Sequence, residues 1–234
     1  MKNFFITGTD TDVGKTFITC ALIEAFNARG LRAVPMKPIA AGTINVDGIN
    51  INADVAALRK VSGSNATLRD INPYLFNAPI APHLAARREN VLIEMHVIRA
   101  AFERIKADAD TVLVEGAGGF LVPLSASQSM AEIPSALTLH VILVVGMRLG
   151  VLNHALLTVE AIRARGLTLA GWVANTPVGG EAMLAFKENL ATLRHMIDAP
   201  LLGTVPFVTQ SNGTLEPARH AAKNLQIDIL IKGN

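Results

Sequence analysis

The chain has 234 residues, of which 50% are hydrophobic and 17% are charged, and its formal net charge at pH 7 is +2. This length suits one α/β domain with a substantial buried core, and the small net charge gives no electrostatic argument for nucleic-acid binding. No apolar run reaches the roughly 18–20 residues that a membrane span requires. We therefore expect a soluble protein with neither nucleic-acid nor membrane partners.

The single cysteine, Cys20, excludes an internal disulfide and fits a reducing compartment. The first residues contain one lysine followed by a strand-like run, which is not the pattern of a secretory signal peptide. We therefore expect a cytoplasmic protein in which Cys20 is a small buried residue on the first helix.

The first predicted strand leads into a glycine-containing loop and then into a helix. The strand-like run begins at Phe4, Gly14-Lys15-Thr16 closes the loop, and apolar residues recur at helical spacing from Phe17. In this order, backbone N–H groups and a helix N-terminus can bind phosphates, Lys15 can reach the outer phosphates, and Thr16 can bind Mg²⁺. Five residues separate Gly8 from Gly14, one more than in the usual motif. An ordinary strand–turn–helix corner is therefore the alternative.

Apolar strand-like runs and helical patterns alternate along the rest of the chain. Strands are predicted at 31–36, 111–114, 141–145, 169–174 and 202–205, with a weak strand at 227–231. Helices are predicted from 52, where Asn52 is the N-cap, and at 93–105, 153–165, 181–197 and 216–224. Residues 40–50, 72–73 and 79–82 are expected to be loops. Pro35 cannot donate to a strand ladder, so its strand is expected either near an edge of the sheet or locally irregular.

This alternation predicts an α/β protein: a single-domain P-loop fold, residues 1–234, with a mostly parallel sheet and helices on both faces. In such sheets, ligands bind beyond the carboxyl ends of the strands. The candidate residues at or just past these ends are Lys15, Lys37, Glu115, Gly150, Asn175 and Pro206. We therefore expect them at one edge of the sheet.

Two carboxylates are candidates for a metal site. Glu115 follows four apolar residues and precedes a glycine-rich turn, where a carboxylate can complete the Mg²⁺ shell of a phosphate loop. A solvated loop glutamate is the alternative. Asp54 falls in the first turn of a helix, where it would bind Mg²⁺ or nucleotide or simply interact with the helix dipole.

Lys37 lies between Met36 and Pro38 at a strand end, where a fixed ammonium could hold a transferring phosphoryl group or an anionic acceptor. Asn175 could read a base edge, although asparagine often closes strands in turns. Asn153 is best interpreted as a helix N-cap, and Trp172 as a core residue on a strand.

Together these segments resemble the ATP-dependent dethiobiotin synthetases, a family of P-loop enzymes that close the ureido ring in biotin biosynthesis. The resemblance covers nearly the whole chain. Its most distinctive segments are residues 8–16, 37–38, 72–74, 114–119, 150–155, 171–175 and 199–203.

The resemblance implies a role for each matching position. The ATP phosphates would be bound by Asp12, Val13, Gly14, Lys15, Thr16 and Phe17. Mg²⁺ would be held by Thr16, Asp54 and Glu115. Further nucleotide contacts would come from Gly116, Ala117, Gly118, Asn175, Thr176 and the backbone near Pro206. Lys15 and Lys37 would be catalytic.

The resemblance also implies the substrates and a homodimer. One amine of 7,8-diaminononanoate would take up CO₂ as a carbamate, which attacks the γ-phosphate of ATP to give a carbamic–phosphoric anhydride. The second amine would then close the ring and release phosphate. The acceptor would contact Thr11, Lys37, Ala41 and Gly118, while its tail carboxylate would bind Gly150, Val151, Leu152 and Asn153 of the partner subunit.

Three positions depart from the family pattern. The family usually has serine where this chain has Ala41 and Ala81, and aspartate is common where it has Thr176. Losing each hydroxyl could weaken acceptor binding by ~1 kcal/mol, unless Thr43 substitutes for one of them.

Two other functions share the predicted fold. A non-catalytic ATPase switch of the partitioning type would carry an additional lysine just after its first glycine, where this chain has Thr9 and Asp10. A related amide-forming synthetase would need a nucleophilic cysteine in a glutaminase domain, and Cys20 lies on the wrong element for that role.

Overall fold

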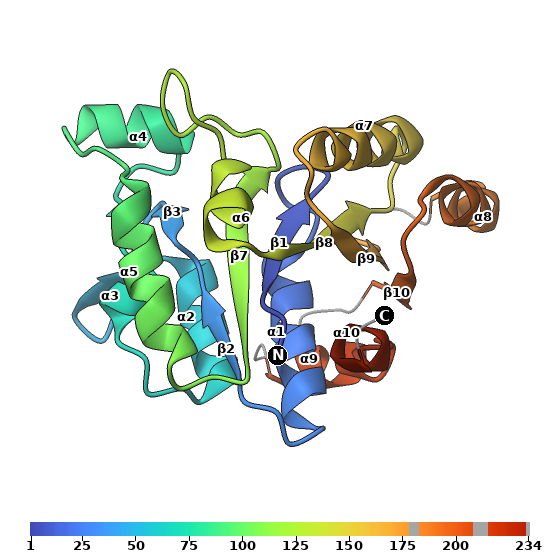
Figure 1. Cartoon of the computed structure of the whole chain (residues 1–234), viewed down its shortest axis with the longest axis horizontal. Helices are drawn as coiled ribbons and strands as arrows, with labels where there is room; N and C mark the ends of the chain where they lie inside the picture. Colours follow the sequence, from blue (N-terminus) through green and yellow to red (C-terminus); the bar gives the residue numbers. More distant parts are fainter. Residues whose placement is uncertain (178–182, 208–214, 233–234) are drawn as a thin grey trace.

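The fold is organised around a six-stranded sheet with the order β10-β9-β8-β1-β7-β2, in which every neighbouring pair is parallel (Figure 1). The computed structural model describes residues 1–177, 183–207 and 215–232. The strands of this sheet are β1 Phe4–Gly8, β2 Ala33–Met36, β7 Thr111–Gly119, β8 His140–Gly146, β9 Leu169–Asn175 and β10 Leu201–Val205. The predicted mostly parallel α/β architecture is confirmed.

Helices cover both faces of this sheet. One face carries α1 Lys15–Asn27, α2 Ala53–Ser62, α9 Leu215–Ala222 and α10 Asp228–Lys232. The opposite face carries α5 Met95–Lys106, α6 Glu132–Leu137, α7 Val151–Arg163 and α8 Phe186–Met196. Two shorter helices, α3 Leu68–Ile71 and α4 Pro82–Arg88, lie in the segment between α2 and α5. No helix in the described ranges is both long enough and apolar enough to cross a membrane.

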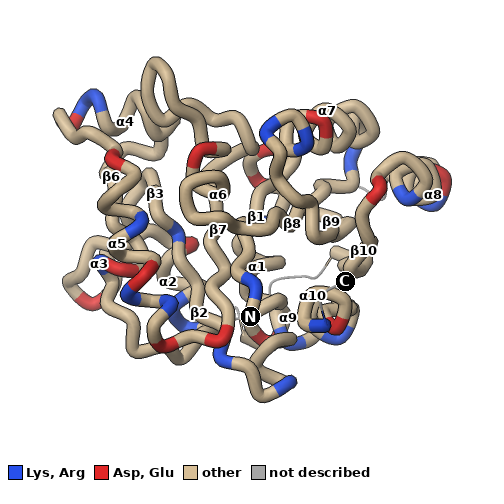
Figure 2. The backbone as a smooth tube through the Cα atoms, viewed as in Figure 1, with Lys and Arg blue, Asp and Glu red and all other residues tan. Residues whose placement is uncertain are grey.

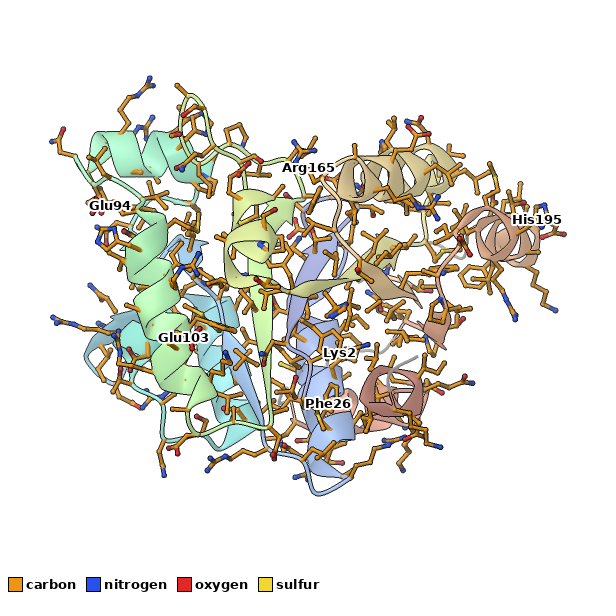
Figure 3. All side chains as sticks on the ribbon, in the orientation of Figure 1. Lys2, Phe26, Glu94, Glu103, Arg165 and His195 are labelled. Carbon is orange, nitrogen blue, oxygen red and sulfur yellow. The ribbon has the colours of Figure 1, made fainter. Side chains whose placement is uncertain are left out.

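The central strand β1 shows why its sequence is continuously apolar. Phe4 and Ile6 point into the core beneath α1, whereas Phe5 points into the core beneath α5, because successive strand side chains alternate between faces. Both faces are covered, so each direction requires an apolar residue. Phe26, labelled in Figure 3, stacks on Phe4 with ring centroids 6.2 Å apart and so fixes α1 against the strand that precedes the loop.

The proline of β2, Pro35, lies in an edge strand of the sheet. Within the described residues, β2 pairs with β7 alone and forms one edge of the sheet. Pro35 is opposite Leu113 in this pairing, and its missing N–H costs no ladder bond on the open side. The predicted edge strand is confirmed.

Residues 40–50 do not form the predicted loop. β3 Ile39–Ala41 pairs in parallel with β6 Tyr74–Phe76, and β4 Ile44–Val46 forms an antiparallel hairpin with β5 Ile49–Ile51. The turn residues Asp47 and Gly48 both have positive φ, 51° and 80°, as a tight two-residue hairpin turn requires. The Asp-Gly pair was the signal for this hairpin in the sequence.

Other boundaries also differ from the prediction. The weak strand predicted at 227–231 is wrong, because Asp228–Lys232 is helical and Ile227 and Leu230 reach the same core at helical spacing. Asn153 is not an N-cap, since α7 begins at Val151 after Gly150. The predicted helix at 181–197 corresponds to α8, while Glu181 and Ala182 lie outside the described residues.

Candidate active site

A pocket of about 1270 Å³ opens at the carboxyl ends of β1, β2, β7 and β9. Its walls come from the loop before α1, the ends of β2 and β3, the start of α2, residues 79–82, and the ends of β7 and β9. Pockets for one small ligand usually measure about 300–1000 Å³, so this one has room for a nucleotide and a second substrate. Acidic and basic residues are interspersed over the outer helices and loops rather than gathered on one basic face (Figure 2).

The loop before α1 owes its shape to two glycines and one valine. Gly14 has φ 89°, and a Cβ on it would lie 2.3 Å from Nδ2 of Asn175. The Val13 side chain is buried against Gly8 and Gly146, where an added Cβ would lie 2.6 Å and 2.7 Å from it. Val13 therefore holds the loop onto β1 and β8, while Gly14 lets the helix begin next to β9.

Lys15 begins α1 and folds back over the loop. Its Nζ donates to the backbone oxygen of Asp10 at 2.9 Å, and the residue is only 7% exposed. Burial lowers the pKa of Lys15 below its usual range, an effect that the charge of Glu115 only partly offsets. A bound triphosphate would supply the negative charge that this buried ammonium lacks.

A buried ion cluster lies beside the loop. Nζ of Lys37 donates to Oε1 of Glu115 at 2.6 Å and to Oδ2 of Asp54 at 2.8 Å. The hydroxyl of Thr16 donates to the same Glu115 oxygen at 2.7 Å. Each of these four residues comes from a different element: β7, α2, the end of β2 and the start of α1. The cluster therefore forms only when the sheet is assembled.

Charge and burial oppose each other in this cluster. Burial alone would lower the pKa of Lys37, but the negative charges of Glu115 and Asp54 raise it above its usual value. Burial likewise acts to raise the pKa of Asp54, and the charge of Lys37 and its hydrogen bond bring that pKa below the usual value. The cluster therefore favours the charged forms of both groups.

The donor atoms of this cluster fit a small divalent cation. A hydroxyl and two carboxylates are the oxygen ligands that Mg²⁺ prefers. Glu115 is fully buried, and its Oε2 has no hydrogen-bond partner among the described residues. A buried acceptor without a partner is costly, and a bound cation would satisfy it.

Asn175 links the end of β9 to the phosphate loop. Its Nδ2 donates to the backbone oxygen of Val13 at 2.8 Å, and the residue is 2% exposed. Its Oδ1 is buried and has no partner within the described ranges. The amide is thus fixed in orientation with a free acceptor, which suits recognition of an amino group on a ligand.

The other half of the pocket is lined mainly by apolar groups. Its lining comes from the end of β3, the segment before α4 and the turn after β7: Ala40, Ala41, Pro79, Ile80, Ala81, Pro82 and Val122. Both positions where the family usually has serine therefore face the pocket as alanines. This half can accommodate an alkyl chain but offers few side-chain hydrogen bonds.

The pocket brings most of the predicted site residues together. Those that line it are Thr11, Asp12, Gly14, Lys15, Thr16, Phe17, Lys37, Ala41, Asp54, Glu115, Ala117, Gly118, Asn175 and Thr176. The predicted proximity of Lys15, Lys37 and Glu115 at one edge of the sheet is confirmed. The functional roles of these residues stay predictions.

Seven other predicted positions lie outside this lining in the described part of the chain. Val13 is buried beneath the loop, and Gly116 faces the core, where a Cβ would lie 2.9 Å from Phe5. At the start of α7, Gly150 and Asn153 are exposed, Leu152 is half-buried and Val151 is buried, while Pro206 is exposed just past β10.

Sequence reasoning also missed parts of the pocket. Asn52 was predicted only as a helix cap, and Val122, Phe207 and Pro217 were not considered, yet all four line the pocket. Apolar wall residues carry no signal in a single sequence, because they resemble core residues. Asn52 did carry such a signal, because it lies two residues before Asp54, a predicted metal ligand.

Comparison with known proteins identifies close relatives. The profile of a family described as an AAA domain matches residues 2–214. ATP-dependent dethiobiotin synthetase BioD of Aromatoleum aromaticum is 52% identical over 94% of this chain and 96% of its own length. The proteins of the same name from Nitrosospira multiformis and Ralstonia nicotianae are 50% and 45% identical, over 88% and 97% of this chain and 88% and 96% of theirs.

Solved structures of more distant proteins share the fold. The MinD cell division protein of Aquifex aeolicus aligns with a TM-score of 0.62 at 13% identity, covering 100% of this chain and 98% of MinD. The signal recognition particle receptor FtsY of Elizabethkingia anophelis aligns with a TM-score of 0.51 at 16% identity, over 94% of this chain and 65% of FtsY. At these identities the likeness shows the fold alone.

Proposed function

Since this chain belongs to the family of ATP-dependent dethiobiotin synthetases, we propose that its pocket holds ATP and 7,8-diaminononanoate side by side and closes the ureido ring with CO₂. The observation that carries this proposal is the position of Lys37, whose buried ammonium lies next to Glu115 at the same edge of the sheet as Lys15. A phosphoryl transfer between two bound substrates needs fixed positive charge at that point.

The loop from Thr9 to Gly14 and the start of α1 bind the phosphates of ATP. Lys15 neutralises the outer phosphates, and the N-terminus of α1 adds partial positive charge. Thr16, Asp54 and Glu115 would hold Mg²⁺, which would neutralise charge that develops on the phosphates during transfer. Asn175 accepts a hydrogen bond from the adenine amino group through its free Oδ1. Thr176, Ala117 and Gly118 line the same side of the pocket.

Lys37 acts where the two substrates meet. One amine of the diamine attacks CO₂ and loses a proton, which leaves a carbamate anion. A carbamate oxygen attacks the γ-phosphorus of ATP, and ADP leaves. The second amine then attacks the carbamoyl carbon, forms the second C–N bond and expels phosphate. The chain offers position and charge rather than a nucleophile, so the Lys37 ammonium stabilises the carbamate and the transferring phosphoryl group.

The apolar half of the pocket suits the hydrocarbon chain of the diamine. Pro79, Ile80 and Val122 form its wall, and Ala41 lies between this wall and Lys37 along the end of β3. An aliphatic chain gains from burial against such residues at roughly 25 cal/mol per Å² of apolar surface. The missing hydroxyls at Ala41 and Ala81 leave polar contacts near the amines to the backbone and to water.

A second copy of the chain completes the acceptor site in this proposal. We infer that residues 1–234 act as one domain in a cytoplasmic homodimer, in which Gly150, Val151, Leu152 and Asn153 of the partner subunit bind the tail carboxylate. Two observations support this arrangement. The start of α7 exposes Gly150 and Asn153 and carries the positive end of the helix dipole, which suits an anion. Two apolar residues beside it, Leu149 and Leu157, are 95% and 56% exposed, as expected for a surface that a partner covers.

An ADP-release assay with product detection tests the function. Purified protein with Mg²⁺ and ATP should release ADP quickly only when both the diamine and bicarbonate are present, and dethiobiotin should form in equal amount. Lys37→Gln should lose dethiobiotin formation while its circular dichroism spectrum stays that of the wild type. ADP release that is indifferent to the diamine would contradict the proposal and would favour an ATPase switch.

A further inference from the structure

Asn52 is a buried polar residue of the pocket wall to which the proposed chemistry assigns nothing. It lies at the junction between β5 and α2, lines the pocket and is only 7% exposed. Its Nδ2 donates to the backbone oxygens of Ala41 at 3.2 Å and Gly42 at 2.9 Å. Its Oδ1 accepts from the backbone N–H of Asp54 at 3.1 Å. One amide therefore joins the end of β3 to the first turn of α2.

The two ends that Asn52 joins enclose a hairpin that buries little of itself. On one face of the hairpin, Ile44, Val46 and Ile49 are 46%, 41% and 53% exposed, and Ile51 at the base of the hairpin is the one apolar residue of that face that is buried in the core. With so little packing, the hairpin itself gives little support to the spacing of the strands and helix on either side of it. The amide hydrogen bonds of Asn52 cross the base of the hairpin and fix that spacing directly.

Each end carries a part of the candidate site. On one side, Gly42 has φ 88°, and a Cβ there would lie 3.1 Å from Cβ of Pro79 in the apolar wall. On the other side, Asp54 receives the cap and holds Nζ of Lys37 at 2.8 Å. A shift of Asn52 would thus reach the apolar wall through Gly42 and the Lys37 ammonium through Asp54.

We propose that Asn52 is a positioning residue that sets the acceptor wall against the Asp54–Lys37 pair. This proposal rests on the proposed function for the identity of the acceptor and of the metal. The hydrogen bonds of Asn52 do not depend on that function. Asparagine suits the task because its amide accepts on one side and donates on the other. Serine would retain the cap to Asp54, but its single short hydroxyl cannot also supply the two donations to the β3 end.

Two substitutions at Asn52 separate the cap from the cross-link. Asn52→Ala removes both, whereas Asn52→Ser restores only the cap. Asn3→Ala is the matched control, because Oδ1 of Asn3 accepts from the backbone N–H of Val112 at 2.8 Å, at the amino-terminal ends of β1 and β7, and Asn3 does not belong to the pocket lining. It should lower the melting temperature through loss of an amide hydrogen bond at the edge of the sheet opposite the site.

The readouts are the melting temperature, the affinity for Mn²⁺ in the presence of ATP measured by calorimetry, and the KM for the diamine. Asn52→Ala should weaken Mn²⁺ binding and raise the diamine KM, each by about tenfold to a hundredfold, as small misplacements of site groups do. Asn52→Ser should recover the Mn²⁺ affinity but keep the raised KM. Asn3→Ala should lower the melting temperature and leave both constants within twofold, roughly the margin expected for a hydrogen bond remote from the site.

Two outcomes would overturn the role of Asn52. One is an Asn52→Ala protein with wild-type Mn²⁺ affinity and diamine KM, and the other is an Asn3→Ala protein that shows the same losses. Mn²⁺ binding does not require ring closure. A wild-type chain that forms no dethiobiotin would therefore sink the proposed function, while the Mn²⁺ affinities of the variants would still decide whether Asn52 positions Asp54.

Discussion

The two halves of the pocket are held in place by different means. The nucleotide half is built from one continuous segment, in which strand β1, the loop and helix α1 follow one another and the glycines permit close backbone contact. The acceptor half is assembled from segments that are far apart in the sequence, and polar side chains such as Lys37 and Asn52 cross-link them. Shape in the first half is local, whereas shape in the second depends on the whole fold.

This difference predicts where substitutions act. A change in the nucleotide half should remove a ligand contact and leave the structure intact, because the backbone of the loop supports itself. A change in the acceptor half should lower both the stability of the fold and the activity, although the chain stays folded, because the same side chains serve both.

The largest expected effect is in the nucleotide half. Lys15→Gln should reduce ATP turnover by about 10²–10³-fold or more, since it removes a fixed charge aimed at the transferring group. The folded structure should tolerate it, because the Lys15 ammonium bonds only to the Asp10 carbonyl among the described residues. Steady-state ADP release together with a thermal melt checks both parts. A variant that unfolds would contradict the separation of the two halves.

Lys37→Gln, in the acceptor half, should lower the stability of the fold as well as the activity. Besides its effect on ring closure, it leaves the fully buried Glu115 without its cationic partner, a change that costs about 3–5 kcal/mol in a buried pair. Mg²⁺ should restore part of the lost stability, because a cation held by Glu115 and Asp54 replaces the missing charge. Urea denaturation with and without Mg²⁺ measures this. Stability that Mg²⁺ leaves unchanged would argue against these carboxylates as metal ligands.

A gain is expected from Ala41→Ser, which restores the hydroxyl that the family usually has. Ala41 lines the pocket near Lys37, and one added hydrogen bond is worth about 1 kcal/mol, or roughly fivefold in the KM for the diamine. The KM for ATP should stay the same. Ala81→Ser is the companion variant in the opposite wall. An unchanged diamine KM in both would mean that this chain satisfies its acceptor by other contacts.

The smallest effect is a pH dependence of stability. Burial acts to raise the pKa of Asp54, but the charge of Lys37 and its hydrogen bond hold that pKa below its usual value in the folded chain. The unfolded state therefore binds the proton more tightly, so this stability is present above about pH 4 and is lost as the pH falls through the folded pKa. Asp54→Asn should flatten the acid side of the stability curve in that window. Denaturation midpoints measured between pH 5 and pH 2 by fluorescence would test it.

The prediction from sequence was good where one element decided its own structure. The strands β1, β7, β8 and β9 were recognised because they are apolar throughout, which follows from burial on both faces. The segment at 227–231 shows the limit. Its alternating apolar residues fit either a strand or a helix, and packing of Ile227 and Leu230 against the core decided for the helix.

The sequence by itself determined the phosphate loop, the order of the elements and the edge at which the charged residues gather, because these follow from local pattern and from the direction of parallel strands. Only the tertiary structure decided that Lys37 bridges Glu115 and Asp54, that Asn175 is fixed by the Val13 carbonyl, and that Asn52 joins two walls of the pocket. These contacts connect residues that are far apart in the sequence, and no local sequence pattern specifies that they lie close together in space. Hydrogen bonds and ion pairs of this kind form only after packing has brought the segments together.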